Sequence, residues 1–420
     1  MIRLLYSLLL ALLIPVWLPG HVKRTKRRAE APNWAERWGK YDIPPPTRPR
    51  IWIHAVSVGE VMAAKSILSK LRESSPDCEI LLTTTTSTGQ EIALGLKNSL
   101  VDYVAYFPFD LPWACKRAVA QARPDIVVMM ETELWFNFLH FAKRFGAKTF
   151  IANGRISDHS FVKAMRWAFF YRRVLANVDE CWMQSDLDKE RITALGGKHV
   201  LVLGNTKFDE PLPSTPPTDW RSVFEDSSDL PIVVIGSIRG EGEEDFVLRA
   251  IAGLRAKVII APRHVERAGQ IAALAKALGW NPVLRSAGDR ARDLLILDTY
   301  GELSSIYAVA DLAIIGGGFE DLGGQNLIQP LAAGCPVVCG THMQNFREAY
   351  EAALESGAAV AVSTREELRG EVERLLGDAE KRAAMGRTGR ALVEGHSGAS
   401  TRIATKILEA LQTLRGADGR

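Results

Sequence analysis

Short apolar runs alternate with helix-like amphipathic segments along most of this chain. This alternation is typical of α/β proteins, in which helices connect parallel strands. In the first half we predict strands at 51–56, 79–84, 126–130, 149–152, 180–183 and 200–203. In the second half we predict strands at 232–235, 258–260, 294–297, 312–315 and 337–339. The pattern therefore predicts two Rossmann-like domains.

A proline-rich segment separates the two sets of strands. Residues 210–219, EPLPSTPPTD, contain four prolines, which disfavour a helix and stiffen a connector. We predict an N-terminal domain at 29–209, a linker at 210–219 and a C-terminal domain at 220–400. Residues 401–420 are predicted to form a helix that packs back on the N-terminal domain. Loops at the carboxyl ends of both sheets are expected to face a central cleft.

The N-terminus combines an apolar run with a basic flank. Leu4 to Leu18 would span about 22 Å as a helix, short of a hydrocarbon core of about 30 Å. A secretory signal peptide is the competing interpretation, but small residues at a cleavage site are missing. We interpret residues 1–28 as an uncleaved membrane anchor, spanning or only inserted, that is dispensable for the chemistry. A buried core helix is the alternative. The positive-inside tendency places the remaining chain in the cytoplasm.

Charge and composition exclude several classes of protein. The formal charge is +3, yet six Lys and Arg residues lie before residue 29, where no acid occurs. Removing them leaves about −3 on the rest of the chain, so nucleic-acid binding is not expected. The five cysteines form no CxxC pair, and the eight histidines show no zinc spacing. No metal site is predicted.

Two glycine clusters follow the apolar strand at 312–315. Residues 316–318 are all glycine, and Gly323-Gly324-Gln325-Asn326 opens a predicted helix. Residues without a Cβ let backbone N–H groups approach an anion such as a nucleotide phosphate. Ordinary glycine turns are the alternative. Arg263 follows another strand and either binds a phosphate in bidentate fashion or pairs with Glu266.

Acidic side chains follow two strands of the first half. Ser57-Val58-Gly59-Glu60 matches a capping box. The functional interpretation is that Glu60 is a general base, which the helix N-terminus keeps ionised at neutral pH. Glu131 and Glu133 suit a metal, a substrate hydroxyl or a helix cap. Asp186-Leu187-Asp188 is interpreted as a first helical turn capped by Ser185, not as a metal motif.

Taken together, the motifs of this chain resemble those of the Kdo transferases. That family moves 3-deoxy-D-manno-oct-2-ulosonic acid (Kdo) from its CMP derivative to a lipid A precursor. The matching segments run in order across the chain: HAVSVGE (54–60), METELW (130–135), ANGRIS (152–157), TKFD (206–209), APRHVER (261–267), DTYGEL (298–303) and GGQN (323–326).

The resemblance implies a GT-B type glycosyltransferase on the cytoplasmic face of the bacterial inner membrane, without a metal or other cofactor. The acceptor is expected on the N-terminal domain and CMP-Kdo on the C-terminal one. Glu60 is implied as the base of an inverting transfer, supported by Glu131 and Lys207. The implied CMP-binding residues are Ser237, Arg239, Pro262, Arg263, Tyr300, Gly301, Glu302, Gly324, Asn326, Leu327, Ile328 and Gln329. Those implied on the acceptor side are Ser57, Gly59 and Glu133.

Three positions depart from the family pattern. Gln329 stands where the family usually has Glu, Leu327 where Pro is common, and Phe136 where Pro follows ETELW. An uncharged Gln329 predicts weaker nucleotide binding. The rival interpretations are a UDP-sugar transferase or nucleotide-sugar epimerase of the same double fold, and a non-enzymatic nucleotide-sugar sensor. Nucleotide preference and the need for a base at Glu60 distinguish them.

Overall fold

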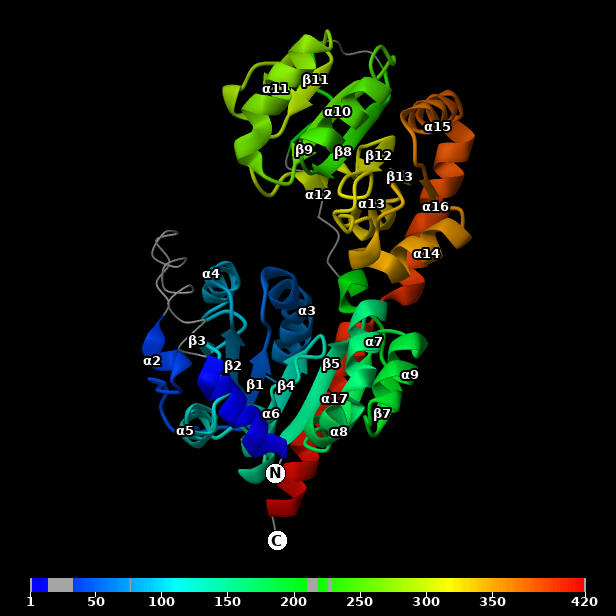
Figure 1. Cartoon of the computed structure of the whole chain (residues 1–420). Coiled ribbons are helices and arrows are strands. Elements are labelled where there is room, and N and C mark those ends of the chain that lie inside the picture. Colours follow the sequence, from blue (N-terminus) through cyan, green and yellow to red (C-terminus); the bar gives the residue numbers. More distant parts are fainter. Residues whose placement is uncertain (1, 14–32, 76, 210–217, 226–228, 419–420) are drawn as a thin grey trace. The chain divides into compact units, whose positions relative to one another are not determined.

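The chain forms two compact units. The computed structural model describes residues 2–13, 33–75, 77–209, 218–225 and 229–418. Unit 1 comprises Met1–Asp209 with Ser397–Arg420, and unit 2 comprises Glu210–His396. Figure 1 shows the elements of both units along the chain. Each unit has its own parallel sheet, so the predicted fold class of two parallel α/β domains is confirmed.

Unit 1 is built on a seven-stranded parallel sheet in the order β3-β2-β1-β4-β5-β6-β7. Its strands are β1 (Arg50–His54), β2 (Glu79–Thr84), β3 (Tyr103–Tyr106), β4 (Ile126–Met130), β5 (Lys148–Gly154), β6 (Glu180–Met183) and β7 (Val200–Val202). Alternate residues of β1 enter different cores: Trp52 packs in one cluster, and Ile51 and Ile53 pack in the other. Helices therefore cover both faces, as parallel sheets require.

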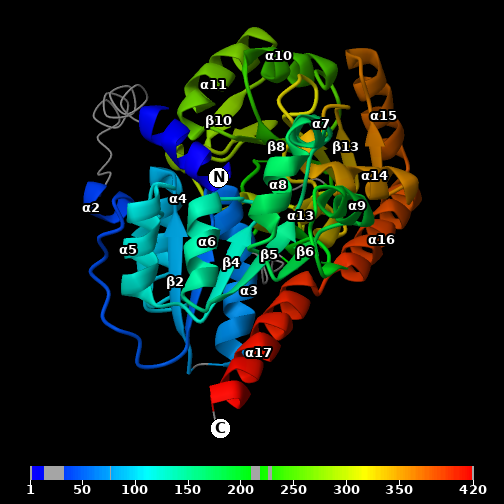
Figure 2. The same cartoon turned by 60° about the horizontal axis from the view of Figure 1, so that its bottom comes forward.

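The helices of unit 1 divide between the two faces. They are α2 (Trp34–Arg37), α3 (Val58–Ser74), α4 (Ser87–Gly95), α5 (Pro112–Ala122), α6 (Phe136–Arg144), α7 (Asp158–Arg166), α8 (Ala168–Leu175), α9 (Asp186–Ala194) and α17 (Ala399–Asp418), with a 3-10 turn η1 (Thr206–Asp209). Helix α17 packs along α3 and buries Ile403, Ile407 and Leu411 (Figure 2). The Asp209 carboxylate accepts bonds from the N–H groups of Gly398 and Ser400 and so holds the start of α17.

Unit 2 repeats the architecture with the strand order β10-β11-β9-β8-β12-β13-β14. Its strands are β8 (Ile232–Ile238), β9 (Lys257–Pro262), β10 (Pro282–Leu284), β11 (Leu294–Ile296), β12 (Leu312–Ile315), β13 (Val337–Cys339) and β14 (Ala359–Ala361). Its α-helices are α10 (Glu241–Ala250), α11 (Ala268–Ala277), α12 (Leu303–Ile306), α13 (Ile328–Ala333), α14 (Arg347–Glu355), α15 (Arg365–Gly377) and α16 (Ala379–His396). Its 3-10 turns are η2 (Val265–Arg267), η3 (Arg285–Ala287) and η4 (Gln344–Phe346).

A helix at residues 2–13 packs on unit 1 with one face. Tyr6 donates a 2.7 Å hydrogen bond from its hydroxyl to Asp110, and Ser7 donates one of 3.1 Å to Asn137. The opposite face exposes six leucines: Leu4, Leu5, Leu8, Leu9, Leu12 and Leu13. Across the described ranges, every helix is too short or too polar to cross a membrane. Residues 14–28 of the predicted anchor lie outside the described residues, as do residues 210–217 of the predicted linker.

Candidate functional site

Glu60 lies at the carboxyl edge of the unit 1 sheet, in the first turn of α3 directly after β1. Its side chain is only 8% exposed. The backbone N–H of Val56 donates to Glu60 Oε2 at 2.8 Å, and the Ser57 hydroxyl donates to Oε1 at 3.2 Å. The Ser57 side chain accepts no capping bond. The predicted capping box is therefore wrong, because the Ser57 hydroxyl serves the carboxylate as a donor.

The surroundings of Glu60 favour its protonated form. Burial raises the pKa of Glu60 to about 7, against the opposing N–H bond from Val56, and the negative charges of Glu131 and Glu133 raise it further. The sequence predicts that the helix N-terminus keeps Glu60 ionised at neutral pH. Desolvation outweighs this stabilisation of the anion, so with a pKa of about 7 the carboxyl group is only partly ionised there. A carboxylate with such a pKa is suited to accept a proton near neutral pH.

The loop after β4 brings two further carboxylates to this edge of the sheet. Glu131 and Thr132 have positive φ angles of 52° and 86°, a conformation that costs energy for residues with a Cβ. The Thr132 hydroxyl donates to the carbonyl of Arg155 at 2.7 Å, and Arg155 Nε donates to Glu131 Oε2 at 3.0 Å. Glu133 is half-buried, and burial raises its pKa. Because β1 and β4 are neighbours, the three acidic side chains gather at adjacent strand ends.

His54 belongs to the same motif as Glu60 but is held neutral. It is fully buried, stacks on Phe107 at 3.7 Å between ring centroids, and has Nδ1 3.1 Å from the Thr83 carbonyl oxygen. Burial lowers the pKa of His54 to about 3. A histidine with this pKa is a poor proton acceptor at neutral pH, so Glu60 remains the better candidate for the base.

Lys207 lies on η1, which packs against α3, the helix that carries Glu60. Two hydrogen bonds to asparagine side chains hold this turn. Thr206 N–H donates to Asn153 Oδ1 at 3.1 Å, and Lys207 N–H donates to Asn205 Oδ1 at 3.1 Å. The Lys207 side chain is half-buried. The three residues implied in catalysis, Glu60, Glu131 and Lys207, thus all belong to unit 1.

In unit 2 a fully buried carboxylate, Glu243, connects two of the predicted donor loops. The N–H of Arg239, after β8, donates to Glu243 Oε2 at 2.8 Å, and the N–H of Phe319, after β12, donates to Oε1 at 3.2 Å. Burial raises the pKa of Glu243, opposed by these N–H groups and that of Gly317. Part of the N–H array that the sequence assigned to a phosphate is therefore occupied by the protein's own carboxylate.

The second glycine cluster adopts a conformation that requires glycine. Gly323 and Gly324 have φ angles of 86° and 76°, and a Cβ on Gly324 would lie 2.4 Å from Met343 Sδ. The following helix begins only at Ile328, later than predicted. The side chains of Leu327 and Ile328 are 0% and 2% exposed, so these two residues present only backbone groups to a ligand.

Other predicted donor residues lie near the same sheet edge. The N–H of Arg263 donates to the carbonyl of Ile238 at 2.9 Å, which places the exposed Arg263 beside the loop of Ser237 and Arg239. Tyr300 is 73% exposed. Pro262 ends β9, and Gly301 has a φ angle of 89°. Asn326 and Gln329 are half-buried. The Glu302 carboxylate accepts two hydrogen bonds of 3.1 Å from Arg285.

Two structural roles escaped the sequence analysis, those of Arg155 and Glu243. Arg155 lies inside the ANGRIS segment, and Glu243 lies in the first turn of a helix after a glycine, which is a familiar place for an acid. The predicted first helical turn at residues 186–188, capped by Ser185, is confirmed, since Asp188 N–H donates to Ser185 Oγ at 3.2 Å. Within the described part of the chain no cluster of three or more His, Cys, Asp and Glu could hold a metal ion.

Comparison with known proteins gives consistent matches. A family model described as 3-deoxy-D-manno-octulosonic-acid transferase (kdotransferase) matches residues 32–210. A 3-deoxy-D-manno-octulosonic acid transferase of Bordetella pertussis is 33% identical over 97% of this chain and 97% of its own. The enzyme of that name from Haemophilus influenzae is 31% identical over 88% of this chain and 89% of its own. A solved glycosyltransferase structure from Rickettsia africae, 13% identical with a TM-score of 0.62, covers 87% of this chain and 99% of its own, a likeness of fold alone.

Proposed function

This chain belongs to the 3-deoxy-D-manno-octulosonic-acid transferase family and is a glycosyltransferase, and from that premise we propose that it transfers Kdo from CMP-Kdo to a lipid A precursor. The observation that carries the proposal furthest is the environment of Glu60. A buried carboxylate at a strand end with a pKa of about 7 is suited to act as the base of such a transfer.

In the proposed reaction the oxygen of an acceptor hydroxyl attacks the anomeric carbon of Kdo. The new C–O bond forms as the bond from that carbon to the CMP phosphate breaks, with inversion, and the hydroxyl proton passes to Glu60. Lys207 supplies positive charge where the sugar carboxylate and the departing phosphate gather negative charge. Glu131, fixed by Arg155, supports the loop beside the base.

The proposal assigns CMP-Kdo to the strand-end loops of unit 2. Arg263 offers a guanidinium for the phosphate and lies beside the loop of Ser237 and Arg239. Gly324 lets its loop pass close to Met343, since a Cβ there would lie 2.4 Å from Met343 Sδ. Gln329 replaces a charged acceptor with a neutral one, which is expected to weaken binding of the nucleotide.

We also propose that unit 1 works at the cytoplasmic face of the inner membrane. The leucines of the N-terminal helix form one exposed apolar face. Helix α8 neighbours this helix, because Phe170 contacts Tyr6. Four further exposed apolar side chains lie on α7 and at the start of α8. These are Val162, Met165, Trp167 and Phe169. Basic residues at 23–28 would add attraction to anionic lipid.

The test uses the full-length protein, CMP-Kdo and a detergent-dispersed tetra-acylated lipid A precursor, with EDTA present because the proposal assigns no metal. Mass spectrometry of the product is expected to show added Kdo. Glu60→Gln is expected to lower turnover by about 10²–10⁴-fold, because an amide cannot accept the proton. Melting temperature and CMP affinity should stay near those of the parent.

Glu73→Gln is the matched control, since Glu73 is an exposed acid at the other end of α3. It is expected to leave turnover unchanged. Turnover of Glu60→Gln close to the parent would remove Glu60 as the base and direct attention to Glu131 or Glu133. A preference of the parent for UDP-sugars over CMP-Kdo would contradict the donor assignment.

A further inference from the structure

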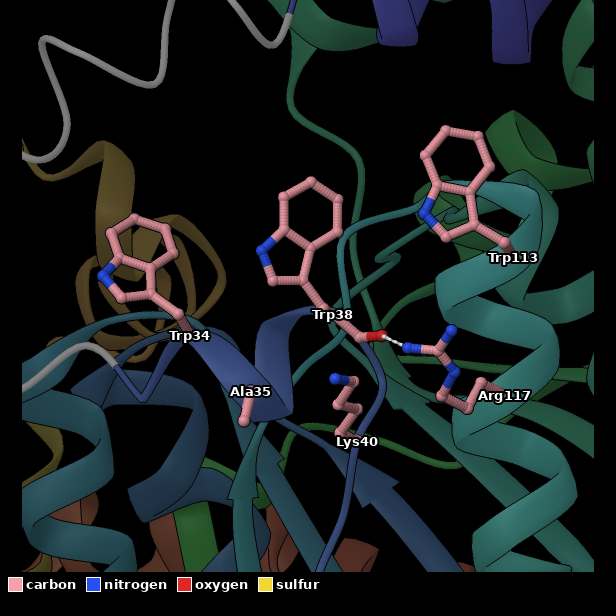
Figure 3. Close-up of a pocket in the computed structure, with 6 residues that line it drawn as sticks. All are labelled: Trp34, Ala35, Trp38, Lys40, Trp113 and Arg117. Atoms are coloured by element: carbon pink, nitrogen blue, oxygen red, sulfur yellow. Dashed lines mark hydrogen bonds between the residues drawn. The ribbon is translucent and has the colours of Figure 1, made fainter.

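Unit 1 carries a pocket of tryptophans and cations (Figure 3). Its volume is about 370 Å³, within the range of small-ligand sites. Its lining comes from α2 and the residues after it and from the start of α5: Trp34, Ala35, Trp38, Lys40, Trp113 and Arg117. The reaction assigned to Glu60 makes no use of these residues.

The pocket is built on fixed backbone. The rings of Trp34 and Trp38 pack on Phe109, with centroids 6.3 Å and 5.1 Å away. Gly39 has a φ of 74°, and a Cβ there would lie 2.1 Å from the carbonyl oxygen of Ala114, so the chain passes α5 closely. Arg117 Nη1 donates to the carbonyl of Trp38 at 3.3 Å and joins the two sides. A preformed pocket loses little entropy on binding.

The chemistry of the lining selects an anionic, partly apolar ligand. Lys40 and Arg117 are exposed cations, and the six lining residues include no carboxylate. In Figure 3 the three indole rings project in the same direction, with Lys40 below Trp38. Trp113 is 51% exposed, a large aromatic surface to leave in water. Indoles offer flat apolar faces, while Lys and Arg donate to phosphate oxygens.

The pocket is connected to the loop that holds Glu60. Arg37, on α2 between the pocket tryptophans, donates from Nη2 to the carbonyl of Thr85 at 2.8 Å. The N–H of Thr85 donates to the carbonyl of Val56 at 3.2 Å, and the N–H of Val56 donates to Glu60. Three successive hydrogen bonds therefore link α2 to the candidate base, and both lie at the carboxyl edge of one sheet.

We propose that this pocket binds a phosphate-bearing sugar of the glycolipid acceptor and orients it toward Glu60. The inference rests on the proposed function and adds a recognition point for the acceptor beyond its reacting hydroxyl. Phosphate oxygens meet Lys40 and Arg117, and the sugar ring and adjoining chain lie against the indoles. A bilayer surface of anionic phospholipid is the other occupant with this chemistry, and the experiment separates the two.

The test compares Arg117→Glu with Lys116→Glu, a matched charge reversal one residue away on α5 that does not line the pocket. The probes are a phosphorylated disaccharide lipid A precursor in detergent and the same lipid after phosphatase treatment. For Arg117→Glu we expect the acceptor KM to rise about tenfold with little change in kcat, the size of a lost charge-assisted bond. The parent should prefer the phosphorylated lipid, and this variant should not. Lys116→Glu should behave like the parent.

Trp113→Ala, which truncates an exposed side chain, is a second variant that should raise the acceptor KM without lowering the melting temperature. Unchanged acceptor KM in both pocket variants would overturn the proposal. So would detergent kinetics that stay normal while binding to phosphatidylglycerol vesicles falls, because the pocket would then contact the bilayer. Fluorescence titration of the tryptophans with the lipid alone tests the pocket even if the parent proves to use another donor.

Discussion

Glu60 is buried and has two acidic neighbours, and both features raise its pKa. The loop that carries Glu131 and Glu133 is held in a strained backbone conformation by Thr132 and Arg155. Strain of this kind persists only where surrounding contacts fix it, and it is common at functional sites. The carboxylates are therefore kept close together in spite of their mutual repulsion.

A pH profile follows from this arrangement. Because burial raises the pKa of Glu60 to about 7, most Glu60 side chains are protonated at pH 6 and cannot accept a proton. We expect kcat/KM to rise with pH through about 7 and then level off. Glu133→Gln removes one charge that raises the pKa of Glu60, so it should move this rise to lower pH. Steady-state kinetics from pH 5 to 9 measure both; a profile flat across that range would contradict the assignment.

Individual residues also mark where sequence reasoning was limited. A motif of Ser and Glu three residues apart identified the position of Glu60 but suggested the wrong hydrogen bonds. The carboxylate accepts from the backbone N–H of Val56 rather than from that of Ser57, and the Ser57 hydroxyl donates to it instead of capping the helix. Which of two neighbouring N–H groups a side chain reaches depends on the path of the strand into the helix, and the pKa depends on burial. Neither is encoded in local spacing.

Among elements, the central strands were predictable and most edge strands were not. β4 and β12 are buried throughout and are continuous apolar runs, and β1 and β8 contain the buried apolar runs 51–53 and 232–235. The strands absent from the prediction are β3, β10 and β14, all at sheet edges. β10 begins with a proline and is half-buried throughout. Edge strands bury fewer side chains and need fewer apolar residues, so their sequence pattern is hard to distinguish from that of loops.

Glu243 connects two elements of the donor unit, which makes a second prediction possible. Glu243→Gln keeps the size but loses the charge that accepts the N–H groups of Arg239 and Phe319. We expect CMP affinity to fall about tenfold as the two loops separate. Glu241→Gln, an 85% exposed acid in the same helical turn, is the control and should bind CMP normally. Calorimetry with CMP measures both variants; equal affinities would show that Glu243 only stabilises the fold.

For the whole molecule, the N-terminal helix has two faces with different tasks. One face contacts Asp110, a buried carboxylate that also accepts the N–H groups of Asn137 and Phe138 at the start of α6. Burial raises the pKa of Asp110, and the Tyr6 hydroxyl is the largest opposing contribution. The other face exposes leucines such as Leu4 and Leu8. The expectation that residues 1–28 are dispensable for the chemistry took account only of the apolar leucines, not of the face that contacts Asp110.

Deletion of residues 1–28 is therefore expected to lower the melting temperature of the full chain by several degrees, because it leaves Asp110 buried with fewer donors. Tyr6→Phe should reproduce part of this destabilisation. We expect it to lower the free energy of unfolding by about 1–3 kcal/mol, since it removes one hydrogen bond to a buried charge and nothing else. The double variant Leu4→Ser and Leu8→Ser is the counterpart. It should melt like the parent yet sediment less with phosphatidylglycerol vesicles, because it alters only the exposed face. A deletion variant that melts at the parental temperature would show that the helix contributes nothing to the stability of unit 1.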